Sequence, residues 1–254
     1  MSKEPKPLEV GTEPWLVETG GRLTTTQAIS LATAGFAQTL RYLFSVRKSL
    51  PRAESIGQSA RVARAREELA KVLETQRGRV LERQGEAVLN HSARTYLFGA
   101  ALVSDEMFSR VEHIVGAVAA LSHDDGLLHP SKRGDCFTGD SAAEAQFMLK
   151  SLGVSTSSVK LARAAVISHF QPNLPAQSGA EAHMVALGAS ADVMGIGLKK
   201  IDPDLLREIW KEWPDLGFIS EVSVLLKGER TRAPRTRPGV LAISGMPYLL
   251  RKSR

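Results

Sequence analysis

The chain has 254 residues, of which 43% are hydrophobic and 24% are charged, as in an ordinary soluble globular protein. Its length fits one large domain or two small ones, with enough apolar side chains to bury a core around a polar site. The single cysteine, Cys136, excludes an intramolecular disulfide and a zinc site built from cysteines.

The net charge of +6 is concentrated at the carboxyl end of the chain. Residues 227–254 hold eight basic residues and one acidic residue, so the remainder is nearly neutral. A short basic tail is typically a solvated end, and we expect no nucleic-acid partner. The amino-terminal stretch MSKEPKPLEV does not resemble a signal peptide, and the uncharged run 23–40 is too polar to span a bilayer. We therefore expect a cytoplasmic protein with no membrane partner.

Helical periodicity dominates the sequence and predicts an all-α fold. Residues 1–22, punctuated by Pro and Gly, are expected to form an extended arm. A helix capped by Thr25 or Thr26 should then run to about residue 46, with an apolar stripe of Ile29, Phe36, Leu40, Leu43 and Phe44. Residues 57–83 are strongly charged and helical, with a buried side predicted to consist of Val62, Leu69, Val72, Leu73 and Val80.

Further helices are predicted at about residues 85–103, 107–122, 140–151, 156–169, 180–196 and 204–212. Residues 228–240 hold two prolines among charges and are predicted to be irregular. We find neither strand alternation nor a repeat. We therefore predict one all-α domain over residues 1–254, with an amino-terminal arm, accessory helices, a functional core, carboxyl-terminal helices and a basic tail at 1–22, 23–84, 85–200, 201–227 and 228–254.

Polar residues interrupt several segments that are otherwise apolar or rich in small residues. His123 and Asp124 end the apolar helix VEHIVGAVAALS, and Gly126 can terminate it. His91 lies on a helical face that is otherwise largely apolar. Asp192 lies among small and apolar residues, with no cation between residues 183 and 199 to pair with it. Because an unpaired buried carboxylate is costly, a metal ion at Asp192 would remove that cost.

Each of these residues also has an ordinary structural explanation. A histidine on an apolar face is most often a core residue bonded to a carbonyl, and an aspartate late in a helix can reach solvent. Two histidines and two aspartates together in such settings instead favour a metal site. Mixed imidazole and carboxylate ligands suit zinc, ferrous iron or manganese. We therefore expect one divalent transition metal per chain.

At these residues the sequence resembles the HD-domain superfamily of metal-dependent hydrolases, in which a first His, a His-Asp pair and a distant Asp lie on separate helices. It is similar to the cyanamide-hydratase-like branch through NHSARTYLFGAAL (90–102), HDDGLL (123–128) and VALGASADVMG (185–195). The segments DCFTGDSAAEAQFML and ISHFQP are also similar to that branch. The resemblance covers residues 85–200, the metal-binding HD core, and implies an HD-type helical bundle with additional amino-terminal helices.

The resemblance also implies roles for particular residues. It makes the metal ligands His91, His123, Asp124 and Asp192. His169 would face the substrate pocket, Asn90 and Asp125 would orient ligand imidazoles, and His169 or Asp125 would transfer protons in catalysis. The remaining histidines, expected to be structural or exposed, are His113, His129 and His183.

The function that the resemblance implies is a metal-dependent hydrolase or hydratase, in which metal-bound water or hydroxide attacks a small polar, nitrogen-containing substrate. Leu127 stands where HD nucleotidases carry an acid and where HD phosphodiesterases carry a lysine, which weakens both phosphohydrolase interpretations. The alternatives are an HD phosphohydrolase, a non-catalytic metal-binding or regulatory HD module, and a diiron HD oxygenase drawing further ligands from His129, His169 and His183. The expected partners are a small-molecule substrate and a second copy of the chain in a homo-oligomer.

Overall fold

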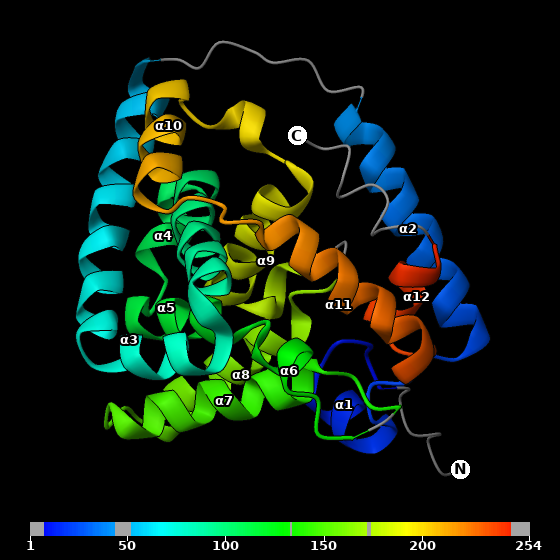
Figure 1. The fold of residues 1–254 in the computed structure, drawn as a ribbon. Helices are drawn as coiled ribbons and strands as arrows, with labels where there is room; N and C mark the ends of the chain where they lie inside the picture. The colour runs from blue at the N-terminus through cyan, green and yellow to red at the C-terminus, as the bar shows by residue number, and fades with distance from the viewer. Residues whose placement is uncertain (1–7, 44–51, 133, 172–173, 245–254) are drawn as a thin grey trace, which may run out of the picture.

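The computed structural model describes residues 8–43, 52–132, 134–171 and 174–244 (Figure 1). These residues form an all-α bundle, so the predicted fold class is confirmed. The one β-type pairing among them is an isolated bridge between Arg22 and Thr236. Within the same described ranges, no helix combines the length and the hydropathy needed to cross a membrane.

In chain order the helices are α1 (Glu13–Thr19), α2 (Thr25–Leu43), α3 (Arg52–Leu102), α4 (Asp105–Ser109), α5 (His113–Ser122), α6 (Asp125–Leu128), α7 (Thr138–Ser151), α8 (Thr156–Ser168), α9 (Ala180–Met194), α10 (Pro203–Glu212), α11 (Phe218–Arg232) and α12 (Arg237–Ile243). Short 3₁₀ turns lie at Ala176–Ser178 and Leu198–Lys200. Figure 1 shows α3 along one side of the bundle and α2 along the other, with α12 beside α2.

The long helix α3 is two helices joined at a kink. Gly85 has φ 73° and ψ 175°, a conformation that glycine adopts readily and that interrupts the helical ladder. This break lies between the two helices predicted at 57–83 and 85–103. The predicted buried side of the charged first part is confirmed, since low exposure is found at Val62, Leu69, Val72, Leu73 and Val80.

The second part of α3 packs backbone to backbone against α9. A Cβ atom added to Gly188 would lie 1.7 Å from the carbonyl oxygen of Thr95, so only glycine allows this approach. Thr95 lies one turn after His91, and Gly188 lies one turn before Asp192. Because residues four apart share a helix face, the contact at Gly188 brings the face that bears His91 against the face that bears Asp192.

The amino-terminal segment differs from the predicted extended arm. Residues 13–19 form α1, because Thr12 caps the helix by accepting from the Trp15 N–H, Pro14 lies in the first turn, and Gly20 ends it in the left-handed conformation. Proline early and glycine late are typical of a helix rather than of an arm. The rest of the prediction, for residues 1–7, lies outside the described residues.

Helix α2 is found where a helix was predicted, but its cap and its buried face are different, and its predicted end near residue 46 lies outside the described residues. Thr24 is the cap: its N–H donates to Gln27 Oε1, and the Gln27 N–H donates to Thr24 Oγ1. Ile29 and Phe36, predicted to be buried, are 62% and 63% exposed. The predicted stripe is therefore wrong at these two positions. Its other members, Leu40, Leu43 and Phe44, have side chains outside the described part of the chain.

Residues 228–240 are not irregular, so that prediction is wrong. Helix α11 continues to Arg232, and α12 begins at Arg237 with Thr236 as its cap and Pro238 in its first turn. Proline is tolerated there because the N–H it lacks has no intrahelical partner. Arg237, expected on a solvated tail, is fully buried and donates from Nη2 to the carbonyl oxygen of Ile167.

The helices between these ends lie close to their predicted positions, with one interruption. The helix predicted at 107–122 is two helices, α4 and α5, because α4 ends at Ser109 and α5 begins at His113. Within α5 every residue from Val115 to Ser122 is buried. This helix therefore runs through the core and delivers the residues that follow it to the interior.

Candidate metal centre

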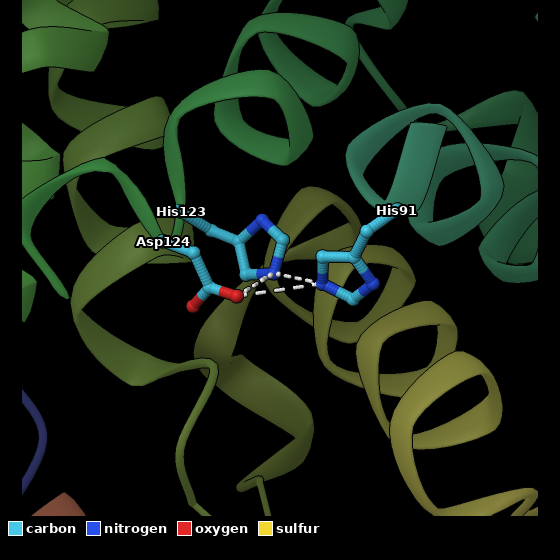
Figure 2. A group of neighbouring side chains, drawn as sticks. All are labelled: His91, His123 and Asp124. Atoms are coloured by element: carbon cyan, nitrogen blue, oxygen red, sulfur yellow. Dashed lines mark hydrogen bonds and ion pairs between the residues drawn. The ribbon is translucent and has the colours of Figure 1, made fainter. Parts of the chain in front are cut away.

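Three buried side chains form a group that can hold a metal ion. His91 projects from the second part of α3, and His123 and Asp124 directly follow α5. Their exposed fractions are 0%, 1% and 6%. Figure 2 shows the His123 and Asp124 side chains converging on one edge of the His91 ring. The structure thus brings together three of the four residues predicted as metal ligands.

The ligand atoms form a nearly equilateral triangle. Nε2 of His91 lies 3.1 Å from Nε2 of His123 and 3.4 Å from Oδ2 of Asp124. Nε2 of His123 lies 3.5 Å from the same oxygen. An ion with bonds of about 2.0–2.2 Å to nitrogen and oxygen places neighbouring ligand atoms about 2.9–3.5 Å apart. All three edges of the triangle fall within that range.

The outer partners of the two imidazoles determine where their hydrogens lie. Nδ1 of His91 is 2.7 Å from Oδ2 of Asp192, and Nδ1 of His123 is 2.7 Å from the carbonyl oxygen of Ala120. Because carboxylate and carbonyl oxygens accept, each Nδ1 carries a hydrogen and donates it. Each neutral ring then has a lone pair on Nε2. Two lone pairs that meet at 3.1 Å repel each other unless a cation, either a proton or a metal ion, joins them.

His169 repeats the local arrangement of His123. Each histidine is the residue that follows an apolar helix, and each Nδ1 donates to a carbonyl three residues earlier, which for His169 is Val166 at 2.6 Å. Nε2 of His169 is buried and has no hydrogen-bond partner among the described residues. It lies 3.7 Å from Oδ1 of Asp124, on the opposite carboxylate oxygen from the triangle. His169 therefore points a further lone pair toward the group.

Asp192, predicted as the fourth ligand, lies outside the group and is not unpaired. Arg94 of α3 donates to both of its oxygens, from Nε at 2.7 Å and from Nη2 at 2.8 Å. The same carboxylate accepts from Nδ1 of His91, on the side of the ring away from His123. The argument that Asp192 lacks a cation is therefore wrong, because the cation comes from another helix. The structure gives Asp192 the position of a residue that orients His91.

The structure also corrects the roles expected for Asp125 and Asn90. Asp125 is bound by Arg83 through two hydrogen bonds, of 2.8 and 2.6 Å, and is not among the described residues that line the cavity. Asp125 is therefore an ion-pair partner of Arg83 and not a proton-transfer group of the cavity. Asn90 donates to the carbonyl of Pro214 rather than to a ligand imidazole.

The other histidines have partners away from the group, in agreement with the expectation that they are structural. His113 meets the hydroxyl of Tyr96 through Nδ1 at 3.0 Å. His129 and His183 each place Nε2 against a backbone carbonyl, of Arg83 and Pro175 respectively. None of the three lines the cavity among the described residues.

The charges of the group depend on its burial and on its internal hydrogen bonds. Burial would raise the pKa of Asp124, but His123 and His91 lower it overall. Burial would likewise raise the pKa of Asp192, and hydrogen bonds from His91 and Arg94 lower it. Burial lowers the pKa of His169 to about 3, so this ring is neutral at pH 7. Burial also acts on His91, but its two carboxylate partners outweigh it and raise the pKa.

The group opens into a cavity of about 110 Å³ that is lined by His91, His123, Asp124 and His169. The other walls come from α2, α6, α9, α11, α12 and the residues that follow α8 and α12. Most of these wall residues are apolar, and the largest are Phe36, Leu127, Phe170, Met194, Leu226 and Leu241. The cavity therefore gives a small molecule access to the ligand atoms.

Two residues that support the site were not predicted from the sequence. Arg94 lies three residues after His91, a spacing that places both on one side of α3, and this spacing was the available signal. Phe218, the first residue of α11, stacks on the His91 ring with centroids 3.9 Å apart and planes 9° apart. No local sequence pattern predicts that contact, because the two residues are far apart in the sequence.

A scan against protein-family models and a search of curated proteins give no match to this chain. The case for its function therefore rests on the geometry of the group and on the sequence pattern.

Proposed function

We propose that the protein is a metal-dependent hydrolase or hydratase that binds one divalent transition metal through His91, His123 and Asp124. The observation that carries the proposal is the pair of buried Nε2 atoms that lie 3.1 Å apart beside a buried carboxylate oxygen. The order of these residues along the chain resembles the HD pattern. Membership of the HD superfamily, and of its cyanamide-hydratase-like branch, is part of the same proposal.

The residues present fit such an ion. Imidazole nitrogen and carboxylate oxygen are ligands that zinc, ferrous iron and manganese accept. Three protein ligands are typical of a catalytic site, which keeps a position for water or substrate. When bound, a divalent ion would lower the pKa of a coordinated water toward about 7 and polarise an electrophile.

The chain's own residues then have distinct tasks. Asp192 accepts from Nδ1 of His91 and so holds the opposite nitrogen toward Asp124, while Arg94 holds Asp192 in place. His169 presents a neutral Nε2 to the cavity. A pKa of about 3 makes this nitrogen a weak base, so as a general base it would take a proton from a water or substrate that a bound ion makes more acidic.

Observations at the cavity favour this reaction class over the alternatives. No lysine or arginine is among the described residues that line it, whereas phosphohydrolases hold an anionic substrate. The described part of the chain contains one group of three potential ligands rather than the two sets that a diiron centre needs. The cavity that reaches these ligands favours turnover over a purely structural metal.

The test is turnover by protein loaded separately with zinc, ferrous iron and manganese, on a panel of neutral nitriles, amides and esters beside p-nitrophenyl phosphate. We expect hydrolysis or hydration of at least one neutral compound and loss of turnover in Asp124→Asn. His169→Gln should keep its metal and lose about 10²–10⁴-fold in kcat, the usual contribution of a general base. His183→Gln is the matched control and should leave turnover unchanged.

Two outcomes would contradict the proposal, and a third would contradict the role of His169 within it. Equal turnover by Asp124→Asn and the wild type would place the chemistry elsewhere. Bound metal without turnover of any compound in the panel would make the protein a metal-binding module. Loss of metal from His169→Gln would make His169 a ligand and remove its role as proton acceptor.

A further inference from the structure

The walls of the cavity carry almost no charge. Asp124, in the metal group, is the only Asp, Glu, Lys or Arg among the described residues that line it. Two buried guanidinium groups lie outside this lining. Arg94 is paired with Asp192 behind His91, and Arg237 donates from Nη2 to the carbonyl of Ile167, while its Nε and Nη1 have no hydrogen-bond partner among the described residues. A charged group that entered this cavity would therefore lose its water without meeting a partner of opposite sign among the described lining residues outside the metal group.

The polar groups on the walls are few and partly engaged. Gln171 donates from Nε2 to the carbonyl of Val10 at 2.6 Å. Ser244 donates its hydroxyl hydrogen to the carbonyl of Val240 at 2.9 Å. Ser190, on α9, is the remaining hydroxyl. Apart from the metal group, the walls thus offer a ligand mainly apolar surface.

Much of the apolar surface comes from three helices in the carboxyl-terminal part of the chain. Helix α9 contributes Val193 and Met194, α11 contributes Val222 and Leu226, and α12 contributes Leu241. Phe36 of α2 lines the cavity and yet is 63% exposed, and Ser244 is also exposed. These two residues mark the mouth, so the cavity runs from solvent to the metal group between apolar walls.

The volume sets the size of what fits inside. An apolar cavity of about 150 Å³ holds benzene, which has six non-hydrogen atoms. By the same scale, the volume of about 110 Å³ holds a body of about four or five carbon atoms. Anything longer must extend through the mouth past Phe36.

We propose that the site takes a neutral molecule with an apolar body of about four or five carbon atoms, whose single polar end faces His91, His123 and Asp124. The part of this inference that concerns the polar end rests on the proposed function. The apolar body replaces the small polar substrate expected from the sequence. Phosphorylated compounds and compounds with a charge at the far end of the body are excluded.

The first experiment measures, by calorimetry on zinc-loaded protein, the affinity of hydroxamates that share a metal-binding head and differ in tail length. The series is acetohydroxamate, butanohydroxamate, hexanohydroxamate and octanohydroxamate, with adipic acid monohydroxamate as the charged counterpart of the six-carbon member. We expect about a fourfold gain in affinity for each methylene up to about six carbons, then a smaller gain for each methylene that extends past Phe36 at the mouth. Affinity that is independent of tail length, or equal for the charged and neutral six-carbon compounds, would overturn the proposal.

A pair of variants tests the walls directly. Met194→Lys keeps the length of the side chain and adds a charge to a half-buried wall position, and Met194→Leu controls for loss of the methionine. Met194→Lys should lower the affinity for hexanohydroxamate and raise the affinity for adipic acid monohydroxamate. Met194→Leu should leave the order of the two affinities unchanged. Leu187→Lys, at an exposed position on the same helix, should behave like the wild type. An unchanged order in Met194→Lys would show that the tail does not lie against this wall.

An experiment on metal-free protein separates this inference from the proposed function. Protein treated with chelator is titrated with 1-pentanol, pentanoate and pentylamine, followed by the shift of thermal unfolding. Binding of pentanol, with no binding of pentanoate or pentylamine, would support the apolar cavity. It would do so even if no metal binds in any preparation. The absence of metal would refute the proposed function alone. Tighter binding of pentanoate or pentylamine than of pentanol would overturn the inference whatever the metal content.

Discussion

Two sides of the cavity are built in different ways. On one side, α3 and α5 carry the candidate ligands and α8 and α9 support them, and α3 and α9 pack so tightly that Gly188 meets the backbone at Thr95. On the other side, α2 and α12 form a wall that exposes apolar side chains at Ile29 and Phe36. The first side holds the ligand atoms in fixed positions. The second side can adjust to the shape of a ligand.

The attachments of the two sides differ in the same way. Asp192 binds both His91 and Arg94, and all three side chains are nearly or fully buried. Among the described residues, the segment that precedes α2 is joined to the carboxyl-terminal segment by two hydrogen bonds, from the Leu23 N–H to the Arg235 carbonyl and from Arg235 Nη2 to the Leu23 carbonyl, and by the bridge at Arg22. The candidate metal ligands therefore lie on tightly packed elements, while part of the mouth of the cavity lies on a lightly held one.

The largest effect is expected from Arg94→Met on the rigid side. The change removes the cation that holds Asp192 and leaves a buried carboxylate with His91 alone, which costs about 3–5 kcal/mol of unfolding free energy. Urea denaturation measures this loss. Arg64→Met is the matched control, because it breaks exposed ion pairs on the same helix and should cost less than about 1 kcal/mol. Equal stability of the two variants would show that Arg94 does not support the site.

The ion pair between Arg94 and Asp192 predicts that the free energy of unfolding falls in acid. The pKa of Asp192 is lowered in the folded protein from its usual 3.8 because His91 and Arg94 outweigh its burial. Its contribution to stability is therefore complete above about pH 4 and is lost as the pH falls toward the lowered value. Unfolding free energy measured between pH 5 and pH 2 should fall less steeply in Asp192→Asn than in the wild type. Identical slopes would contradict the ionised pair.

A smaller loss is expected from Gly188→Ala. The added Cβ would lie 1.7 Å from the Thr95 carbonyl oxygen, so α3 and α9 must move apart at a cost of about 3 kcal/mol. The control is Gly78→Ala on the exposed surface of α3, where no atom lies within 4 Å. That change should stabilise the protein by about 0.5–1 kcal/mol, because alanine favours a helix. Similar stability of both variants would contradict backbone contact between the helices.

The smallest effect is expected on the adjustable side, from Phe36→Ser. Because Phe36 is largely exposed, its loss should change unfolding free energy by less than about 0.5 kcal/mol. It should weaken binding of octanohydroxamate, whose tail reaches the mouth, by about threefold to tenfold. Butanohydroxamate should bind unchanged. A loss of stability as large as that of Gly188→Ala would end the distinction between the two sides.

The sequence predicted the rigid side well because its signals are local. Apolar periodicity located α3, α5, α8 and α9, and the settings of His91, His123 and Asp124 pointed to one group of ligands. The partner of Asp192 could not be found in this way. Arg94 and Asp192 are 98 residues apart, and their pairing depends on how two helices cross.

The adjustable side was predicted poorly for a physical reason. A helix buries whichever face its neighbours cover, and α2 is covered by α12. That helix was not predicted, because segment 228–240 holds two prolines among charges. Ile29 and Phe36 therefore looked like core residues although they remain exposed. The partner of Asp125 could not be predicted from the sequence for a similar reason, because Arg83 lies on a different helix.

The central claim is tested most directly by the transition-metal content of purified protein, measured by elemental analysis without chelator. We expect about one ion per chain in the wild type and in His113→Ala, whose side chain lies outside the group. His91→Ala and Asp124→Ala should lose the ion while circular dichroism shows them folded. Metal content that is equal in all four proteins, or no metal in folded wild type under any loading condition, would contradict the account.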